Sequence, residues 1–378
     1  MRATRRVVLM GAAATTAASA AEVPARAHAP AVPVPRVPLS SFEGFTDDDR
    51  LSAFMSWAAA QTHRGITVAL DEARSYLFTR SHTLYDGFSI LGSPRPQDQA
   101  RSSMPVGQQV VLRTAGGWFG LGGPQTFGCS FQGLSIDGAA DSRLVEGHPS
   151  YVLWTSVFRD LSAQNCGGVL GSSSQPLLNT ACTVDGWWNV NNVRDRAFSL
   201  GGSDTFFKPS QMLLDSPADL LPDSGFLLSY DHQSKGELSG LYCTAEGHSG
   251  ILLRGGSGVT VRGNVVEGRN ADAPCHGALL RVEGGTWLIR DNVLNYAMAD
   301  PAATGRDDGG VVHVASGTVL IDGVVHDRAS AVSEETPLVH VAAGRVRVRN
   351  VMASFRPVVR QAVPGLVDAD DTVRVVTG

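Results

Sequence analysis

Residues 250–266 read GILLRGGSGVTVRGNVV, and three later stretches repeat their pattern. These are GALLRVEGGTWLIRDNVL from Gly277, GVVHVASGTVLIDGVV from Gly310 and PLVHVAAGRVRVRNVM from Pro337. Each stretch contains a short apolar strand, a Gly-rich corner, a second β-branched strand, and then Asn or Gly before Val. Repeats of about 20 to 50 residues built from short strands, with no helical stretch between them, predict a β-solenoid.

The corner glycines of these repeats place a set of basic residues at equivalent positions. Gly258, Gly285, Gly317 and Gly344 are 27, 32 and 27 residues apart, and Gly236 marks an earlier coil. Four residues before the five glycines stand His232, Arg254, Arg281, His313 and His340. Because paired strands lie about 4.8 Å apart, we expect one basic ladder that points outward between apolar neighbours. Such a ladder suits an acidic polymer, although a solvated basic face would have the same pattern.

The N-terminus has the features of an export signal. Arg5 and Arg6 precede the apolar run VVLMGAAATTAASA, whose last residues are small enough for cleavage. Residues 1–29 are therefore predicted to be a signal peptide of the twin-arginine (Tat) type, and residues 30–41 a Pro- and Ala-rich linker. We expect a secreted, extracellular protein with no membrane insertion after the signal is removed.

The rest of the chain is long enough for one large all-β domain. We expect a cap helix at 42–62, a right-handed parallel β-helix at 63–352 and a C-terminal strand or tail at 353–378. Thr46 can cap the helix before three aspartates, and one apolar stripe follows at Leu51, Phe54, Met55 and Ala58. A cap is needed because the first coil of a solenoid exposes strand edges and apolar core.

Charge and cysteine usage limit the possible partners. A net charge of -5 excludes a generally basic protein that coats nucleic acid. The number of cysteines is odd and their spacing irregular, so buried free thiols are favoured over a disulfide framework, with one disulfide left open. The five are Cys129, Cys166, Cys182, Cys243 and Cys275.

The opening coils carry a resemblance to a known superfamily. The YLF strand at Tyr76 and the run DGFSILG at Asp86 resemble the first coils of pectin-lyase-like right-handed parallel β-helices. The mature chain as a whole is similar to this superfamily. Its members are mostly secreted enzymes that cleave acidic polysaccharides, together with phage tailspikes. The resemblance implies a carbohydrate ligand, most simply an acidic polysaccharide, and a monomer or a homotrimer.

A sharper local match covers roughly 70 residues. Ser234-Lys235, followed by GILLRGG, resembles the central coils of the chondroitinase B and alginate lyase family. In that family a Ser-Lys pair precedes a Leu-x-Leu-Arg-His-Gly strand, and the Lys and Arg are catalytic. The resemblance implies that Lys235 is the base and Arg254 its partner. The sequence departs from the family at two points: Gly255 replaces the family's His, and the calcium-binding Glu residues before the Lys are missing.

A lyase removes the proton next to a uronate carboxylate and then expels the glycosidic oxygen. The reaction needs a cation, a base and a proton donor. Lys235 precedes Arg254 by close to one short coil, so the two could be neighbours, with His232 as an alternative base. Substrate would lie on Arg281, His313, His340, Trp187 and Trp188, and Asp231 with Glu246 could hold calcium. Alternatively, Lys235 is a solvated corner residue and the tryptophans belong to the core.

Two other functions stay open. A glycoside hydrolase needs two carboxylates about 5 to 9.5 Å apart. The candidates are Asp307, Asp308, Glu246, Glu267 and Glu283, and the run DDGGVVHVA at Asp307 resembles inulin fructotransferases in one coil. A tailspike-like adhesin would use the same basic ladder to bind a polysaccharide without cleaving it.

Overall fold

The computed structural model describes residues 35–61, 65–72, 74–92, 108–216, 226–245, 249–268, 278–296, 310–328, 337–353 and 357–378. The predicted signal peptide lies outside the described residues, as do Glu246, Cys275, Asp307 and Asp308. Residues 34–378 form one unit of mostly β-structure. Within the described part of the chain, no helix has both the length and the apolar character needed to cross a membrane.

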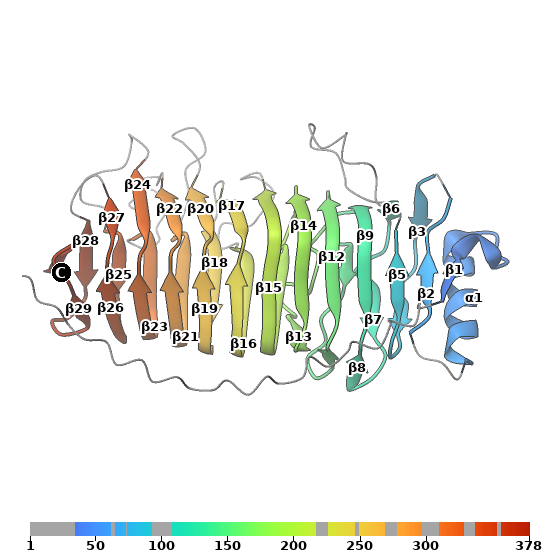
Figure 1. The fold of residues 1–378 in the computed structure, drawn as a ribbon, viewed down its shortest axis with the longest axis horizontal. Helices are drawn as coiled ribbons and strands as arrows, with labels where there is room; N and C mark the ends of the chain where they lie inside the picture. The colour runs from blue at the N-terminus through green and yellow to red at the C-terminus, as the bar shows by residue number, and fades with distance from the viewer. Residues whose placement is uncertain are drawn as a thin grey trace, which may run out of the picture. The chain divides into compact units, whose positions relative to one another are not determined.

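The described strands pair in parallel from coil to coil, so the unit is a parallel β-helix, as the repeats predicted. Figure 1 shows the coils side by side in chain order. Three ladders of strands follow one another around each coil. The first ladder contains β1 (Arg36–Pro38), β2 (Thr67–Ala69), β5 (Ser89–Leu91), β9 (Ser130–Asp137), β12 (Val157–Gln164), β14 (Thr183–Asn191), β15 (Phe198–Ser216), β16 (Phe226–Ser239), β19 (Ser257–Arg262), β21 (Leu280–Arg290), β23 (Val312–Asp322), β26 (Arg345–Arg349) and β29 (Val367–Ala369).

The second ladder shares the long strands β9, β12, β14 and β15 with the first, because these strands continue past a bend. It also contains β3 (Tyr76–Phe78), β6 (Gln108–Leu112), β17 (Leu241–Ala245), β20 (Val265–Gly268), β22 (Val293–Tyr296), β24 (Val325–Arg328) and β27 (Met352–Ala353).

The third ladder positions the candidate site. It runs through β4 (His82–Leu84), β7 (Gly117–Leu121), β10 (Arg143–Val145), a bridge at Leu170, the first halves of β15 and β16, β18 (Ser249–Arg254), the first halves of β21 and β23, β25 (Val339–Val341), β28 (Val358–Gln361) and β30 (Arg374–Thr377). A side row of β8 (Gln125–Phe127), β11 (Val152–Trp154) and β13 (Leu177–Thr180) joins it at β15. We call the outward side of this ladder the third-ladder face.

The helix α1 (Asp47–Ala59) caps the first coils, as predicted. Thr46 and Asp49 form a reciprocal capping box, and the predicted stripe of four apolar residues is buried. Asp48 is buried as well and fastens the helix to the coils: its carboxylate accepts hydrogen bonds from Thr79 and contacts the imidazole of His82 at 2.9 Å. The aspartates that favour the positive end of the helix therefore also attach it to the solenoid.

The paired strands extend beyond the predicted span of 63–352. β1 lies in the predicted linker and pairs with β2, while β28, β29 and β30 continue the coils through the predicted tail. A 3₁₀ turn, η1 (Leu39–Ser41), joins β1 to the cap. Strands of three or four residues with Pro or Gly beside them have too little periodicity to be recognised from sequence.

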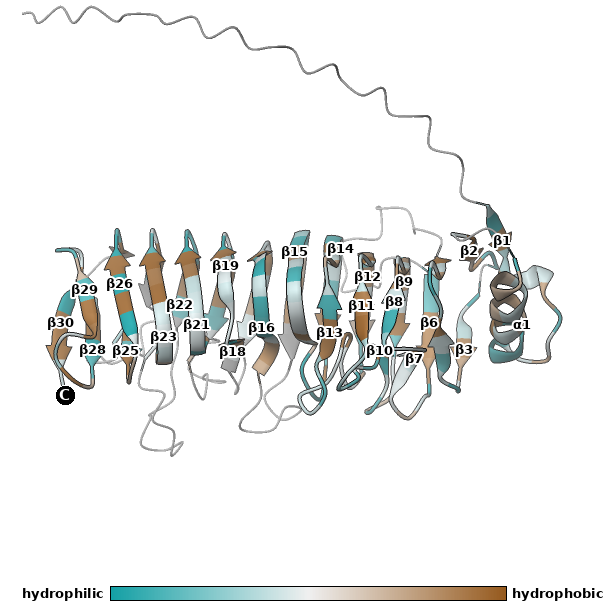
Figure 2. Cartoon of the chain, turned by 90° about the horizontal axis from the view of Figure 1, so that it is seen from below, coloured by the Kyte–Doolittle hydropathy of each residue, from teal (hydrophilic) through white to brown (hydrophobic). Residues whose placement is uncertain are grey.

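The core fills the space enclosed by the coils. Apolar and polar residues alternate along the strands in Figure 2, and the inward residues stack from coil to coil. Phe131 and Phe158, for example, are nearly parallel with ring centroids 5.1 Å apart. Among the described residues, the predicted buried thiols are confirmed at Cys129, Cys166, Cys182 and Cys243.

Each of five consecutive coils turns at one residue with left-handed backbone. These residues share one register position, and their φ values lie between 53° and 74°: Gly240, Gly263, Asp291, Gly323 and Asn350. The next position holds buried Asn264 and Asn292 in two neighbouring coils. The Asn292 amide donates to Val261 O and Arg290 O, and its oxygen accepts from the Asn264 backbone and side chain. The "Asn or Gly before Val" of the repeats is this turn.

The Asn292 side chain is predicted to be a main support of the turn. Asn292→Ala leaves several buried backbone groups without partners, so we expect it to lower the free energy of unfolding by about 2 to 4 kcal/mol. Denaturant unfolding followed by circular dichroism measures this. Asn295→Ala is the control, because Asn295 is only half-buried and donates to the Glu267 side chain. Equal losses in the two variants would contradict the prediction.

Candidate functional site

The third-ladder face carries a column of basic residues. Strand pairing places Arg281, His313, His340 and Arg360 at one register position in four consecutive coils. We call these four residues the basic column. The sequence predicted the register of the first three, and the structure adds Arg360. The prediction that all of them point outward is wrong for His313, which is buried with 5% of its surface exposed. The signal for Arg360 was present, since PVVR at 357–360 repeats PLVH at 337–340.

Arg254 and His232 do not belong to the basic column, which corrects the predicted single ladder. Arg254 pairs in register with Asp231 and Glu283, and Leu252 takes the position next to Arg281. The corner glycine that stacks on Gly285 is Gly256 rather than Gly258. The pairing of β19 with β21 shifts between Ser257 and Val259, so Gly258 is one residue too many. Counting four residues back from Gly258 therefore gives Arg254. Counting back from Gly256 gives Leu252, the residue that pairs with Arg281.

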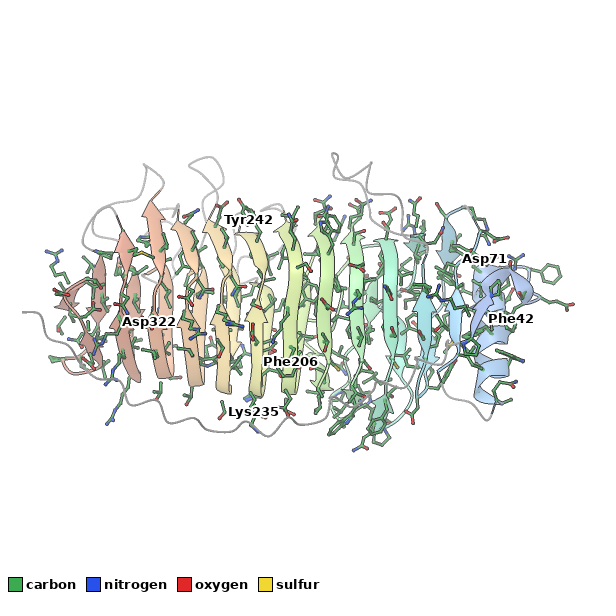
Figure 3. All side chains as sticks on the ribbon, viewed as in Figure 1. Phe42, Asp71, Phe206, Lys235, Tyr242 and Asp322 are labelled. Carbon is green, nitrogen blue, oxygen red and sulfur yellow. The ribbon has the colours of Figure 1, made fainter. Side chains whose placement is uncertain are left out.

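Lys235 is not a neighbour of Arg254, so that prediction is wrong. One coil spans 23 residues from Asp231 to Arg254, whereas Lys235 precedes Arg254 by only 19. Lys235 has left-handed backbone and an exposed side chain at the next corner, level with Ser257 and Gly258. Figure 3 shows it at the lower edge of the coils.

His232 and Arg254, in contrast, lie close together. His232 follows Asp231 and has left-handed backbone with an exposed imidazole. A Cβ on Gly255 would clash with the His232 ring at Nδ1. The imidazole thus rests over Gly255, the residue directly after Arg254. Gly255, which stands where the lyase family has a His, leaves room for this ring because it has no side chain.

Two carboxylates hold Arg254 in place. Its Nε lies 3.1 Å from Glu283 Oε2 and its Nη1 3.7 Å from Asp231 Oδ1, and its side chain remains 40% exposed. Arg281 Nε also donates to Glu283, at 2.7 Å. Burial raises the pKa of Glu283, but the hydrogen bonds from Arg281 and Arg254 outweigh it, so the pKa is lowered overall. Glu283 is therefore an anion shared by two guanidinium groups.

Asp231 is the buried anchor of this cluster, with 4% of its surface exposed. Burial raises the pKa of its carboxyl group, although Arg254 and Arg196 oppose the shift. Ser229 donates to its Oδ2 at 3.2 Å. A carboxylate facing two guanidinium groups does not fit the predicted calcium site, because these cations would repel the metal. The described residues contain no cluster of metal ligands, and Glu246 lies outside them.

The predicted pair of tryptophans does not form a sugar-stacking surface. Trp188 is fully buried, donates to Asp185 O at 2.8 Å and packs against Phe198. It belongs to the core and cannot touch a ligand. Trp187 is half-buried in the same strand.

A cavity that sequence reasoning missed opens over the first coils of the third ladder. Its volume is about 610 Å³, and Arg143, Glu146 and Asp195 line it together with glycines of β7. These residues come from non-repeating coils far apart in the sequence, so no spacing pattern connected them.

Comparisons with known proteins show the fold. No protein-family model matches the chain, and a search of curated proteins found no match. Among solved structures, DFA-IIIase from Arthrobacter chlorophenolicus without its lid is similar with a TM-score of 0.65 and 13% identity, covering 91% of this chain and 98% of that one. The same enzyme in complex with GF2 has a TM-score of 0.61 and 12% identity, over 90% and 94% of the two chains. A tailspike protein mutant of E. coli bacteriophage HK620 in complex with a pentasaccharide has a TM-score of 0.54 and 10% identity, over 90% and 65%. The shared feature is the parallel β-helix.

The raised pKa of Asp231 predicts a pH effect with a definite sign. A carboxyl group whose pKa is higher in the folded state costs stability as the pH rises from its unfolded pKa, about 3.9, through its folded pKa. Asn does not titrate, so Asp231→Asn should gain stability relative to the wild type over this pH range and then level off. Unfolding midpoints measured between about pH 4 and pH 7 test this. A stability difference that stays flat over this pH range would contradict the prediction.

Proposed function

We propose that this protein is a secreted enzyme that binds an acidic polysaccharide along the third-ladder face and cleaves it by β-elimination. The basic column carries the proposal, because Arg281, His340 and Arg360 are half-buried side chains at one register position of the third-ladder face, with the buried imidazole of His313 between the first two. Neighbouring positions are about 4.8 Å apart, so the column can follow an extended polyanion. The solved relatives in complex with GF2 and with a pentasaccharide support a saccharide ligand on this fold.

The cluster next to the column supplies the groups that elimination needs. Arg254, half-buried and held by Glu283 and Asp231, neutralises the uronate carboxylate together with Arg281. His232 takes the proton from the carbon beside that carboxylate. The electrons of the broken C–H bond form the C=C bond while the bond to the glycosidic oxygen breaks. The imidazolium then returns the proton to the leaving oxygen. Lys235 has no part in this scheme.

Hydrolysis is the second candidate because Asp231 and Glu283 flank the same Arg254. Their pKa values move in opposite directions, upward for Asp231 by burial and downward for Glu283 by the hydrogen bonds that outweigh its burial. Such a pair assigns an acid and a base. Asp231 is almost completely buried, however, whereas His232 is exposed and Arg254 and Arg281 are only half-buried. Elimination therefore needs less rearrangement of the site.

Absorbance near 235 nm distinguishes the alternatives, because elimination creates an unsaturated uronate that absorbs there. The mature protein is incubated with alginate, pectate and glycosaminoglycans, with and without calcium. We expect a rise with one polymer, a loss of at least about 100-fold in rate for His232→Ala and for Arg254→Ala, and a rate near wild type for Lys235→Ala. New reducing ends without absorbance would identify a hydrolase, and retention without cleavage a binding protein; either overturns the proposed elimination.

Gly255 offers a matched test of the His232 position. Gly255 and Gly263 both have left-handed backbone, with φ of 60° and 62°, so Ala costs a similar strain of about 1 to 2 kcal/mol at each. Only at Gly255 does the added Cβ meet the His232 ring. We expect Gly255→Ala to lower the elimination rate at least tenfold and Gly263→Ala to leave it near wild type, at equal unfolding midpoints. Equal rates would remove His232 from the mechanism.

A further inference from the structure

The cavity over the first coils is an open depression lined by glycines and polar side chains. Its floor includes Gly116, Gly117 and Gly120 of β7 and the loop before it, so no large side chain fills the space. Gly120 pairs in register with Thr83 of β4. On its other side β7 pairs with β10, which ends one residue before Glu146. A Cβ on Gly120 would meet no atom within 4 Å. The open volume of about 610 Å³ is large enough for a small ligand.

Arg143 organises the wall of the pocket. Its side chain is 10% exposed, its Nη1 donates to Gly171 O at 2.8 Å, and its Nε lies 3.2 Å from Glu146 Oε2. The same Nη1 is 3.8 Å from Asp195 Oδ2. The guanidinium is therefore held by Gly171 and by two carboxylates, and it fixes Glu146 and Asp195 at the edge of the cavity.

The chemistry of the wall selects the ligand. Asp141, Glu146 and Asp195 outnumber the single guanidinium three to one, so the pocket repels a carboxylate group. Ionised carboxylates are pure acceptors, and the hydroxyls of Ser172 and Ser174 can accept as well. A ligand with many hydroxyl donors and no negative charge fits this wall.

We propose that this pocket binds an uncharged, hydroxyl-rich sugar unit. The pocket lies on the same face as the basic column. One row of residues paired in register connects the two: Val145, Leu170, Phe198, Leu228, Ile251 and Leu280. Glu146 of the pocket follows Val145, and Arg281 of the column follows Leu280. Five strand steps separate these two residues, about 24 Å. This part of the inference rests on the proposed function, and it makes the substrate a polymer that contains uncharged sugars as well as uronates.

Filling the pocket tests the inference without involving the basic column. The probes are uncharged malto-, cello-, manno- and fructo-oligosaccharides, with binding measured by saturation-transfer NMR and titration. Gly120→Leu fills the open volume. Gly123→Leu is the control, because a Cβ at Gly123 also meets no atom within 4 Å and Gly123 does not line the pocket. We expect one oligosaccharide class to bind wild type, Gly123→Leu and Arg281→Ala alike, and at least tenfold more weakly to Gly120→Leu. Asp195→Asn should weaken binding in a second, isosteric way.

The outcomes separate this inference from the proposed function. If no uncharged oligosaccharide binds, if only an amine-bearing chitosan oligomer binds, or if Gly120→Leu binds as the wild type does, the pocket is not the proposed subsite. Retention of pectate that is lost in Arg281→Ala and kept in Gly120→Leu supports the basic column independently. Loss of that pattern, with oligosaccharide binding intact, would overturn the polyanion site and leave the pocket in place.

Discussion

One backbone constraint governs the C-terminal coils: each must turn at a residue with left-handed conformation. L-residues with a Cβ pay about 1 to 2 kcal/mol there, and only Gly, Asn and Asp adopt it routinely. The chain places Gly, Asp or Asn at this position in every one of the five coils from Gly240 to Asn350. Because the turn recurs at a fixed place in each coil, the strands that precede and follow it stay in register from coil to coil. The inward residues can then stack into a continuous core, and the outward residues into columns.

The same register creates an electrostatic problem on the third-ladder face, since equal positions of adjacent coils are only about 4.8 Å apart. A continuous run of arginines would repel itself. Charges of opposite sign alternate instead. Asp231, Arg254 and Glu283 follow one another in adjacent coils, and Arg281 forms an ion pair with Glu283. Histidines, which can be neutral, follow Arg281 in the basic column. The cations are thus held in fixed positions while Arg254 keeps an exposed side.

The sequence was sufficient for the fold because repetition and alternation are local signals. The repeats, the cap helix with its stripe and the Arg281, His313, His340 column could all be read from it. The relation of Arg254 to Lys235 could not, because it depends on coil length, and one extra glycine at Gly258 shifts the count. Which of two adjacent strand residues points inward also depends on register shifts, such as the one between Gly186 and Trp187 in β14, and Trp188 proved to be core. Arg143, Glu146 and Asp195 meet only through tertiary structure.

The solenoid also sets the distance between features of the third-ladder face. Each coil contacts only its neighbours, so a coil can be duplicated or lost without rebuilding the rest. Each such event would lengthen or shorten the third-ladder face by one step of about 4.8 Å. The distance between the acidic pocket and the basic column is therefore a whole number of coils, recorded in the gene as a number of repeats. Selection for a polymer with a different spacing of charged and uncharged units could act on repeat number, with every individual contact left unchanged.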